Sequence, residues 1–76
     1  MRLPHRKVLR RVRIHQRGER PSLEGLYLGE RAGHYVLARA AILESADRTI
    51  ALESDEVWVP RDAVVFMEVW EGGGGS

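Results

Sequence analysis

The chain has 76 residues, no cysteine and a formal net charge of +1. A chain of this length fits one small domain, and without cysteine it has neither disulfides nor thiolate metal sites. Its apolar runs stay short of the roughly 20 residues of a membrane-spanning helix, and its basic start leads into no apolar segment, so we expect a cytoplasmic protein with no secretory signal and no membrane partner.

Charge is distributed unevenly along the chain. Residues 1–20 hold eight basic side chains and one acidic side chain, a net charge of +7, whereas residues 21–76 hold four basic and ten acidic side chains, a net charge of −6. A basic segment of this kind binds phosphate or an acidic protein surface, which includes the acidic part of a second copy. The sign pattern alone leaves both kinds of partner open.

The N-terminal part predicts an arm followed by a strand. We expect residues 1–6 to form a flexible basic arm, because a proline discourages regular structure and chain ends are loose unless docked. Residues 11–15 alternate polar and apolar side chains, which is the period of a half-buried strand, and predict a strand over about residues 9–16. A helix is the alternative there, because Val8 and Val12 would share one helical face.

Residues 22–43 predict two strands joined by a tight turn. Aromatic and branched side chains on both sides favour a sheet, and Gly33 accommodates a positive φ in the turn. Two glycines in the first strand, Gly25 and Gly29, predict a sharp bend or a close backbone contact. A helix over residues 35–44 is the alternative for the second strand, because alanine and leucine favour helices.

The rest of the chain alternates short strands with polar turns. In order, we predict a loop over residues 44–48, a strand over 49–52, an acidic turn over 53–56, a strand over 57–59, a one-turn 3₁₀ helix over 60–63 and a last strand over 64–70. The sequence GGGGS at residues 72–76 is typical of a flexible linker and of an engineered scar, so the β domain is expected to span residues 7–71. We expect the core to come from apolar side chains of the strands, namely Val12, Ile14, Leu26, Leu28, Val36, Leu37, Ile50, Leu52, Val57, Val59, Val64, Phe66 and Val69.

The order of these elements resembles an SH3-like small β-barrel, and most closely its Sm-like variant. The run Gly25-x-Tyr27-x-Gly29 resembles the G-x-L-x-G of the family's first motif, and VPRDAV at residues 59–64 resembles its I-R-G-D-N-V. The resemblance implies an all-β fold, a five-stranded small barrel with a one-turn 3₁₀ helix before the last strand.

The residues with which the Sm family holds an RNA base are not matched. In that family an Asp and an Asn beside the first hairpin turn, and an Arg-Gly pair before the last strand, form the base pocket. Here the turn is ERAG at residues 30–33 and the pair is Pro60-Arg61, so the pocket is not present in recognisable form. Over residues 8–70 the chain is also similar to small proteins encoded among phage and prophage virion genes, which implies a virion setting rather than an activity.

The sequence indicates no catalytic, metal or cofactor site. His5, His15 and His34 are far apart and lack the spacing of metal ligands, and the acidic pair Asp55-Glu56 is typical of a solvated turn. There is no G-x-S-x-G motif, no glycine-rich phosphate loop before a helix, and no nucleophile and base at a spacing typical of a catalytic site. We therefore expect a protein that is not an enzyme and uses no cofactor.

The basic segment and the aromatic side chains are the candidate binding residues. The candidates for contacts with phosphates or with an acidic protein surface are Arg6, Lys7, Arg10, Arg11 and Arg13. Residues 1–20 contain no aromatic side chain for base stacking, which favours non-specific electrostatic contact. The candidates for a partner interface are Trp58, Trp70 and Tyr35, because aromatic side chains are enriched in interface cores. We expect a structural module that forms homo-oligomers or binds a virion protein through its sheet edges, with nucleic-acid binding as the alternative.

Overall fold

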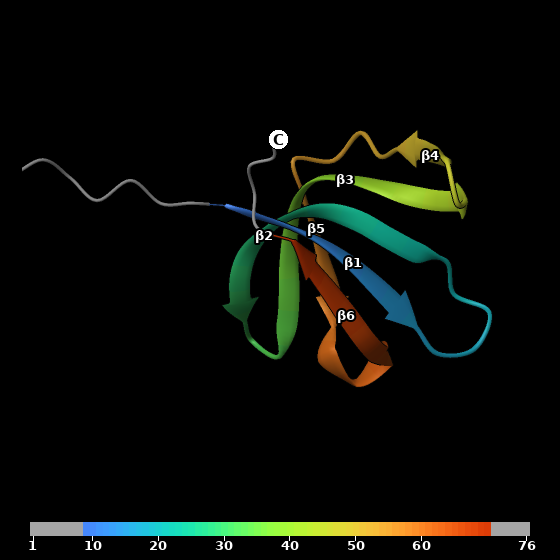
Figure 1. Ribbon diagram of the computed structural model, residues 1–76. Helices are drawn as coiled ribbons and strands as arrows, with labels where there is room; N and C mark the ends of the chain where they lie inside the picture. Colours follow the sequence, from blue (N-terminus) through green and yellow to red (C-terminus); the bar gives the residue numbers. More distant parts are fainter. Residues whose placement is uncertain (1–8, 71–76) are drawn as a thin grey trace, which may run out of the picture.

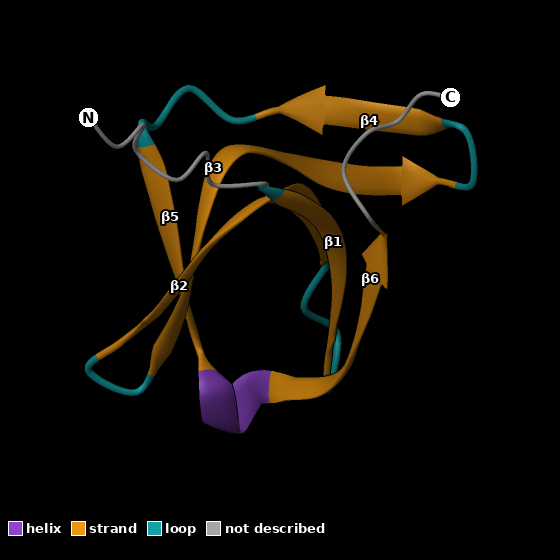
Figure 2. Cartoon of the chain, turned by 60° about the vertical axis from the view of Figure 1, so that its left-hand side comes forward, coloured by secondary structure: helices purple, strands orange, loops and turns teal. Residues whose placement is uncertain are grey.

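The computed structural model describes residues 9–70, which form an all-β fold with one short 3₁₀ helix (Figure 1, Figure 2). In chain order the elements are β1 (Arg10–Gln16), β2 (Ser22–Arg31), β3 (His34–Ser45), β4 (Arg48–Ala51), β5 (Glu56–Pro60), the 3₁₀ helix η1 (Arg61–Ala63) and β6 (Val64–Trp70). The two segments that also fitted a helical pattern are the strands β1 and β3. The predicted arm over residues 1–6 and the predicted linker over residues 72–76 lie outside the described residues.

The strands form one antiparallel sheet in the order β4-β3-β2-β1-β6, with β5 beside β3. The first part of β3, His34–Ala38, pairs with β5, and its second part, Ala41–Ser45, pairs with β4. The sheet therefore has six strands, one for each predicted strand segment and one more than the five of the predicted barrel, because the long β3 takes two partners along one edge. Within residues 9–70 there is no helix long and apolar enough to cross a membrane.

The described strands do not close into a barrel. β5 is at one side of the sheet and β6 is at the other, and η1 carries the chain between them (Figure 2). In the described part of the chain β5 and β6 share no strand pairing, so each keeps an edge without a neighbouring strand. The predicted five-stranded barrel is therefore not confirmed, whereas the predicted 3₁₀ turn before the last strand is present.

Gly25 lets β2 and β3 approach closely where the sheet bends. A Cβ on Gly25 would lie 3.0 Å from the carbonyl oxygen of Ala38 and 3.2 Å from the Cα of Ala40, so glycine fits here and a side chain does not. The register of β2 against β3 shifts at this point, and Arg39 has a positive φ of 53°. Such a bulge bends and twists the strand locally. The close backbone contact predicted for a glycine in this strand is confirmed at Gly25.

The core lies on the inner face of the curved sheet. Its buried members are Val12, Ile14, Leu23, Val36, Leu37, Ala40, Val59 and Ala63, of which Leu23, Ala40 and Ala63 were not predicted. Three predicted core residues are wrong, because Ile50, Phe66 and Val69 are 48%, 54% and 52% exposed. They belong to β4 and β6, which have a neighbouring strand on one side only. Five more predicted core residues are only half-buried, namely Leu26, Leu28, Leu52, Val57 and Val64.

Candidate interaction surface on β1 and β6

The outer face of β1 carries predicted basic side chains, and β6 places aromatic side chains beside them. Across the β1–β6 ladder, Arg11 is opposite Trp70 and His15 is opposite Phe66. Residues directly opposite in an antiparallel ladder have their side chains on the same face. The fold therefore supplies, next to the arginines, the aromatic groups that residues 1–20 lack.

Two arginines on this face share one carboxylate. Arg11 Nη2 lies 3.2 Å from Glu24 Oε2, and Arg13 Nε lies 3.8 Å from the same oxygen. The guanidinium carbon of Arg13 is 5.2 Å from the ring centroid of Trp70, within the range of a cation–π contact. The positive charge predicted for this strand is thus partly neutralised by Glu24 in β2.

His15 is at the centre of a row of polar side chains. Its Nε2 is 2.9 Å from Glu68 Oε1, its Nδ1 is 3.0 Å from Ser22 Oγ, and its ring stacks on Phe66 with the centroids 4.3 Å apart. A carboxylate only accepts hydrogen bonds, so Nε2 is the donor to Glu68. Ser, His and Glu are the residue types of an acyl-transfer triad, but such a site also needs a recess for the substrate. Neither hollow described below is lined by these side chains, and we assign the row to holding β1, β2 and β6 together.

β6 exposes apolar side chains on both of its faces. The exposed set is Val65, Phe66, Val69 and Trp70, with exposed fractions of 60%, 54%, 52% and 41%. Phe66 and Trp70 lie on the outer face, whereas Val69 is opposite the buried Val12 and faces the inner side. Glu68 is the one charged residue of the strand. An apolar edge with so little charge is a surface to which another strand can add.

The other predicted interface residues lie at the opposite side of the sheet. Trp58 in β5 is exposed, and its Nε1 donates a hydrogen bond to Glu56 Oε1 at 3.0 Å. Tyr35 is half-buried and packs against the core together with Tyr27, its ring centroid 6.2 Å from that of Tyr27. The structure therefore places Trp58 and Trp70 on different edges and turns Tyr35 inward.

The β2–β3 turn is joined to η1 through Arg61. Arg61 Nη1 donates to Glu30 Oε2 at 2.6 Å, and the Arg61 amide donates to the Gly33 carbonyl oxygen at 2.9 Å. The hydrogen bond to Glu30, and then the charge of Glu30, raise the pKa of Arg61 above its usual value. Burial raises the pKa of Tyr27, and the charge of Glu30 and the neighbouring Tyr35 raise it further.

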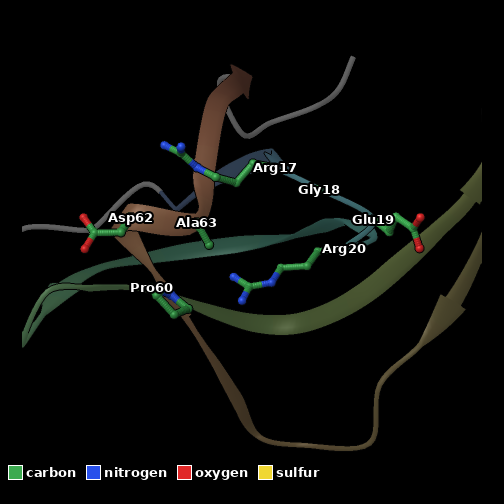
Figure 3. A pocket seen from close by; sticks show the side chains of 7 residues that line it. All are labelled: Arg17, Gly18, Glu19, Arg20, Pro60, Asp62 and Ala63. Carbon is green, nitrogen blue, oxygen red and sulfur yellow. The ribbon is translucent and has the colours of Figure 1, made fainter.

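An open hollow of about 570 Å³ lies between the β1–β2 turn and η1 (Figure 3). Its lining residues are Arg17, Gly18, Glu19, Arg20, Pro60, Asp62 and Ala63. The Arg17 amide donates to the Ala63 carbonyl oxygen at 2.8 Å, which holds the two turns together. A second hollow, of about 230 Å³, is lined by Arg11, Glu24, Gly25, Leu26, Arg39, Ala41 and Thr49. The sequence predicted neither hollow, because each joins segments that are far apart along the chain.

The other residues predicted to bind phosphate or an acidic protein surface are Arg6, Lys7 and Arg10. Arg10 is exposed at the start of β1, whereas Arg6 and Lys7 lie outside the described residues. Among residues 9–70 no group of three His, Asp or Glu side chains is arranged to hold a metal ion. Phe66 and Val69 are the residues of the surface that were placed wrongly from the sequence, since both were predicted in the core.

Comparisons with protein-family models, with curated proteins and with solved structures give no significant match. We therefore infer the function from the geometry of the surface.

Proposed function

We propose that this chain is a non-enzymatic assembly module that binds a second copy, or another protein, by accepting a strand at the β6 edge. The observation that carries the proposal is the set of exposed apolar side chains on both faces of an edge strand. Natural sheets protect such edges with charges, prolines or bulges. β6 has no proline and one charged residue, Glu68, and its bulge is confined to Val65 at its beginning.

The architecture that fits this role is an SH3-like small barrel left open between β5 and β6. The strand order β6-β1-β2-β3-β5 across the sheet supports this assignment, as does the position of η1 in the chain between β5 and β6. Virion assembly is proposed as the setting only on the resemblance of residues 8–70 to small phage virion proteins.

The affinity expected from this edge is modest. Complete burial of a large apolar side chain contributes about 1.5–3 kcal/mol, so four half-exposed side chains contribute about 4 kcal/mol together. Loss of translational and rotational freedom costs roughly 4–15 kcal/mol. The backbone hydrogen bonds of an added strand, at about 0.5–1.5 kcal/mol each, must supply the rest. We therefore expect association in the micromolar range or weaker.

Sedimentation velocity of a lysine variant tests the proposal. Val65→Lys combined with Val69→Lys places charge on the β6 edge without removing a buried side chain, and we expect it to shift the chain to monomer. Ile50→Lys is the matched control, because Ile50 is similarly exposed in another edge strand, β4. Loss of association in both variants, or in neither, would contradict a specific role of β6.

Nucleic-acid binding is the second candidate, and one observation favours it. Arg13 and Trp70 are in cation–π contact on the face where Phe66 is also exposed. Basic side chains interleaved with aromatic rings on a sheet are the usual platform for single strands. The carboxylate of Glu24 between the arginines weakens this candidate, because it competes with phosphate for them.

The salt dependence of binding tests the second candidate. If Arg10, Arg11 and Arg13 contact duplex phosphates, replacing all three with Gln should reduce the slope of log K against log salt by about 2.7, at roughly 0.9 per contact. The expected result is that neither duplex nor single strand binds measurably at about 50 mM salt, where phosphate contacts are strong. That result would exclude this candidate.

A further inference from the structure

Two groups of like charges without an ion pair among residues 9–70 lie at separate places in the fold. Arg17 and Arg20 line the larger hollow, and neither forms an ion pair with any of residues 9–70. By contrast, other arginines do form ion pairs: Arg11 in β1 pairs with Glu24, Arg48 in β4 pairs with Glu44, and Arg61 in η1 pairs with Glu30. The hollow therefore holds two arginines that form no ion pair with any described residue, with the carboxylates of Glu19 and Asp62 also in its lining.

Figure 3 shows how the hollow is arranged. The guanidinium group of Arg20 points across the opening towards Pro60, and that of Arg17 lies on the other side of Ala63. The two carboxylates of the lining, those of Glu19 and Asp62, point outward and away from Arg20. Arg20 is therefore the charged side chain of the lining whose end group faces into the hollow, whereas the carboxylates of Glu19 and Asp62 lie at its margins.

The complementary charge is in the segment before β5. Glu53, Asp55 and Glu56 are all exposed, and none of them forms an ion pair among residues 9–70. The other acidic turn offers less, because Glu44 is already paired with Arg48 at 3.3 Å. Residues 53–56 therefore carry the densest negative charge that the described chain leaves free.

One chain cannot bring these two places together. The acidic segment ends where β5 begins, at Glu56, and the hollow lies at the far end of the same strand, at Pro60. Both views show the segment and η1 at opposite ends of the fold (Figure 1, Figure 2). Five residues of strand span about 13 Å from first to last Cα, at roughly 3.3 Å per step. The hollow and the acidic segment can therefore meet only between two molecules.

We propose that the hollow lined by Arg17 and Arg20 docks the acidic segment Glu53–Glu56 of a second copy of this chain. The two surfaces are different, so the contact is head-to-tail and builds a ring or a longer assembly. The contact extends the proposed self-association and supplies a polar interface distinct from the β6 edge. Because its charges are at the surface, it weakens as salt rises.

A charge swap tests this contact with two variants. One variant carries Arg17→Glu with Arg20→Glu, and the other carries Glu53→Arg with Asp55→Arg. Each alone should raise the apparent dissociation constant of self-association at least tenfold, measured by sedimentation velocity at about 50 mM salt, where screening is weak. An equal mixture should restore association, since each variant's hollow then faces a segment of opposite charge.

A matched control separates this contact from a general effect of charge. Arg31→Glu with Arg39→Glu reverses two exposed arginines that also lack ion pairs among the described residues but lie outside the larger hollow. It should associate like the parent, and circular dichroism should show the same fold for every variant. Unchanged association in both hollow and segment variants, failure of the mixture to recover, or a monomeric parent would overturn the inference.

The outcome also distinguishes this inference from the proposed function. If Val65→Lys with Val69→Lys abolishes association while the charge variants do not, the β6 edge stands and the hollow contact is wrong. If charge reversal abolishes association and the mixture restores it while the β6 variant is unaffected, the hollow contact stands and the edge proposal is wrong.

Discussion

Replacing Gly25 with alanine adds one methyl group at the closest backbone contact between β2 and β3. The new Cβ would lie 3.0 Å from the carbonyl oxygen of Ala38 and 3.3 Å from the Cβ of Leu37, which is fully buried. Neither atom is the far end of a flexible side chain, so the strands themselves must separate. At an open site the same substitution would stabilise the fold by about 0.4–1 kcal/mol, because alanine restricts the unfolded chain.

The two effects of Gly25→Ala on the free energy of unfolding have opposite signs. The sign of the measured change therefore shows which of them is larger. Overpacking a well-packed site costs about 1–3 kcal/mol, which outweighs the gain from alanine and leaves a net loss of about 1–2 kcal/mol. For a domain of this size each kcal/mol lowers Tm by about 4–8 °C, so we expect Gly25→Ala to lower Tm by roughly 5–15 °C.

Thermal and urea unfolding followed by far-ultraviolet circular dichroism measures this effect. Parent and variant are compared at one protein concentration, because association stabilises the folded state by mass action. Gly25→Val adds further methyl groups at the same position and should lower Tm more. A Tm for Gly25→Ala equal to or above that of the parent would refute the close contact and, with it, the reason that the sheet bends here.

Two further predictions concern groups within the fold. The pKa of Tyr27 is raised by burial, so the folded state favours the neutral phenol. Its contribution to stability is complete below about pH 10, the unfolded value, and is lost as pH rises through the folded pKa. Alkaline unfolding should therefore be less steep in Tyr27→Phe than in the parent. Tyr35→Phe should have a smaller effect, because Tyr35 raises the pKa of Tyr27 less than burial does. Glu24→Gln should lower the free energy of unfolding by about 1–3 kcal/mol, because two arginines lose their shared carboxylate. Urea unfolding should show a smaller loss, of about 0.3–0.5 kcal/mol, for Glu44→Gln, whose pair with an arginine is exposed. Equal losses in the two Gln variants would contradict a special role of Glu24.

Much of the local structure could be predicted because it depends on neighbouring residues. The alternation around Val12 and Ile14 indicates a half-buried strand, and both side chains are buried in β1. Gly33 adopts a positive φ of 77° in the β2–β3 turn, as its place between two strands predicts. Pro60 ends β5 and precedes η1, since proline lacks the amide hydrogen that a strand would use next.

The candidate surface could be predicted only in part, because strand pairing decides which side chains meet. Glu24 neutralises Arg11 and Arg13 through the register of β1 against β2, which joins residues from separate strands. Trp70 meets Arg13 through the register of β1 against β6, the first and last described strands. Neither register can be read from local composition, so the sequence suggested free arginines without aromatic neighbours.

The sequence by itself determined that the chain is all-β, where most strands begin and end, and that a short 3₁₀ turn precedes the last strand, because these follow from local residue preferences. Only the tertiary structure decided that β3 pairs with both β4 and β5, that the sheet stays open, and that β6 is an edge. The run VVFMEVW at residues 64–70 has apolar residues at consecutive positions. Without an alternation of polar and apolar residues, the sequence does not indicate which of these side chains face the core. Phe66 and Val69 are exposed because an edge strand is covered on one side only, a property of the whole sheet and not of the strand's own residues.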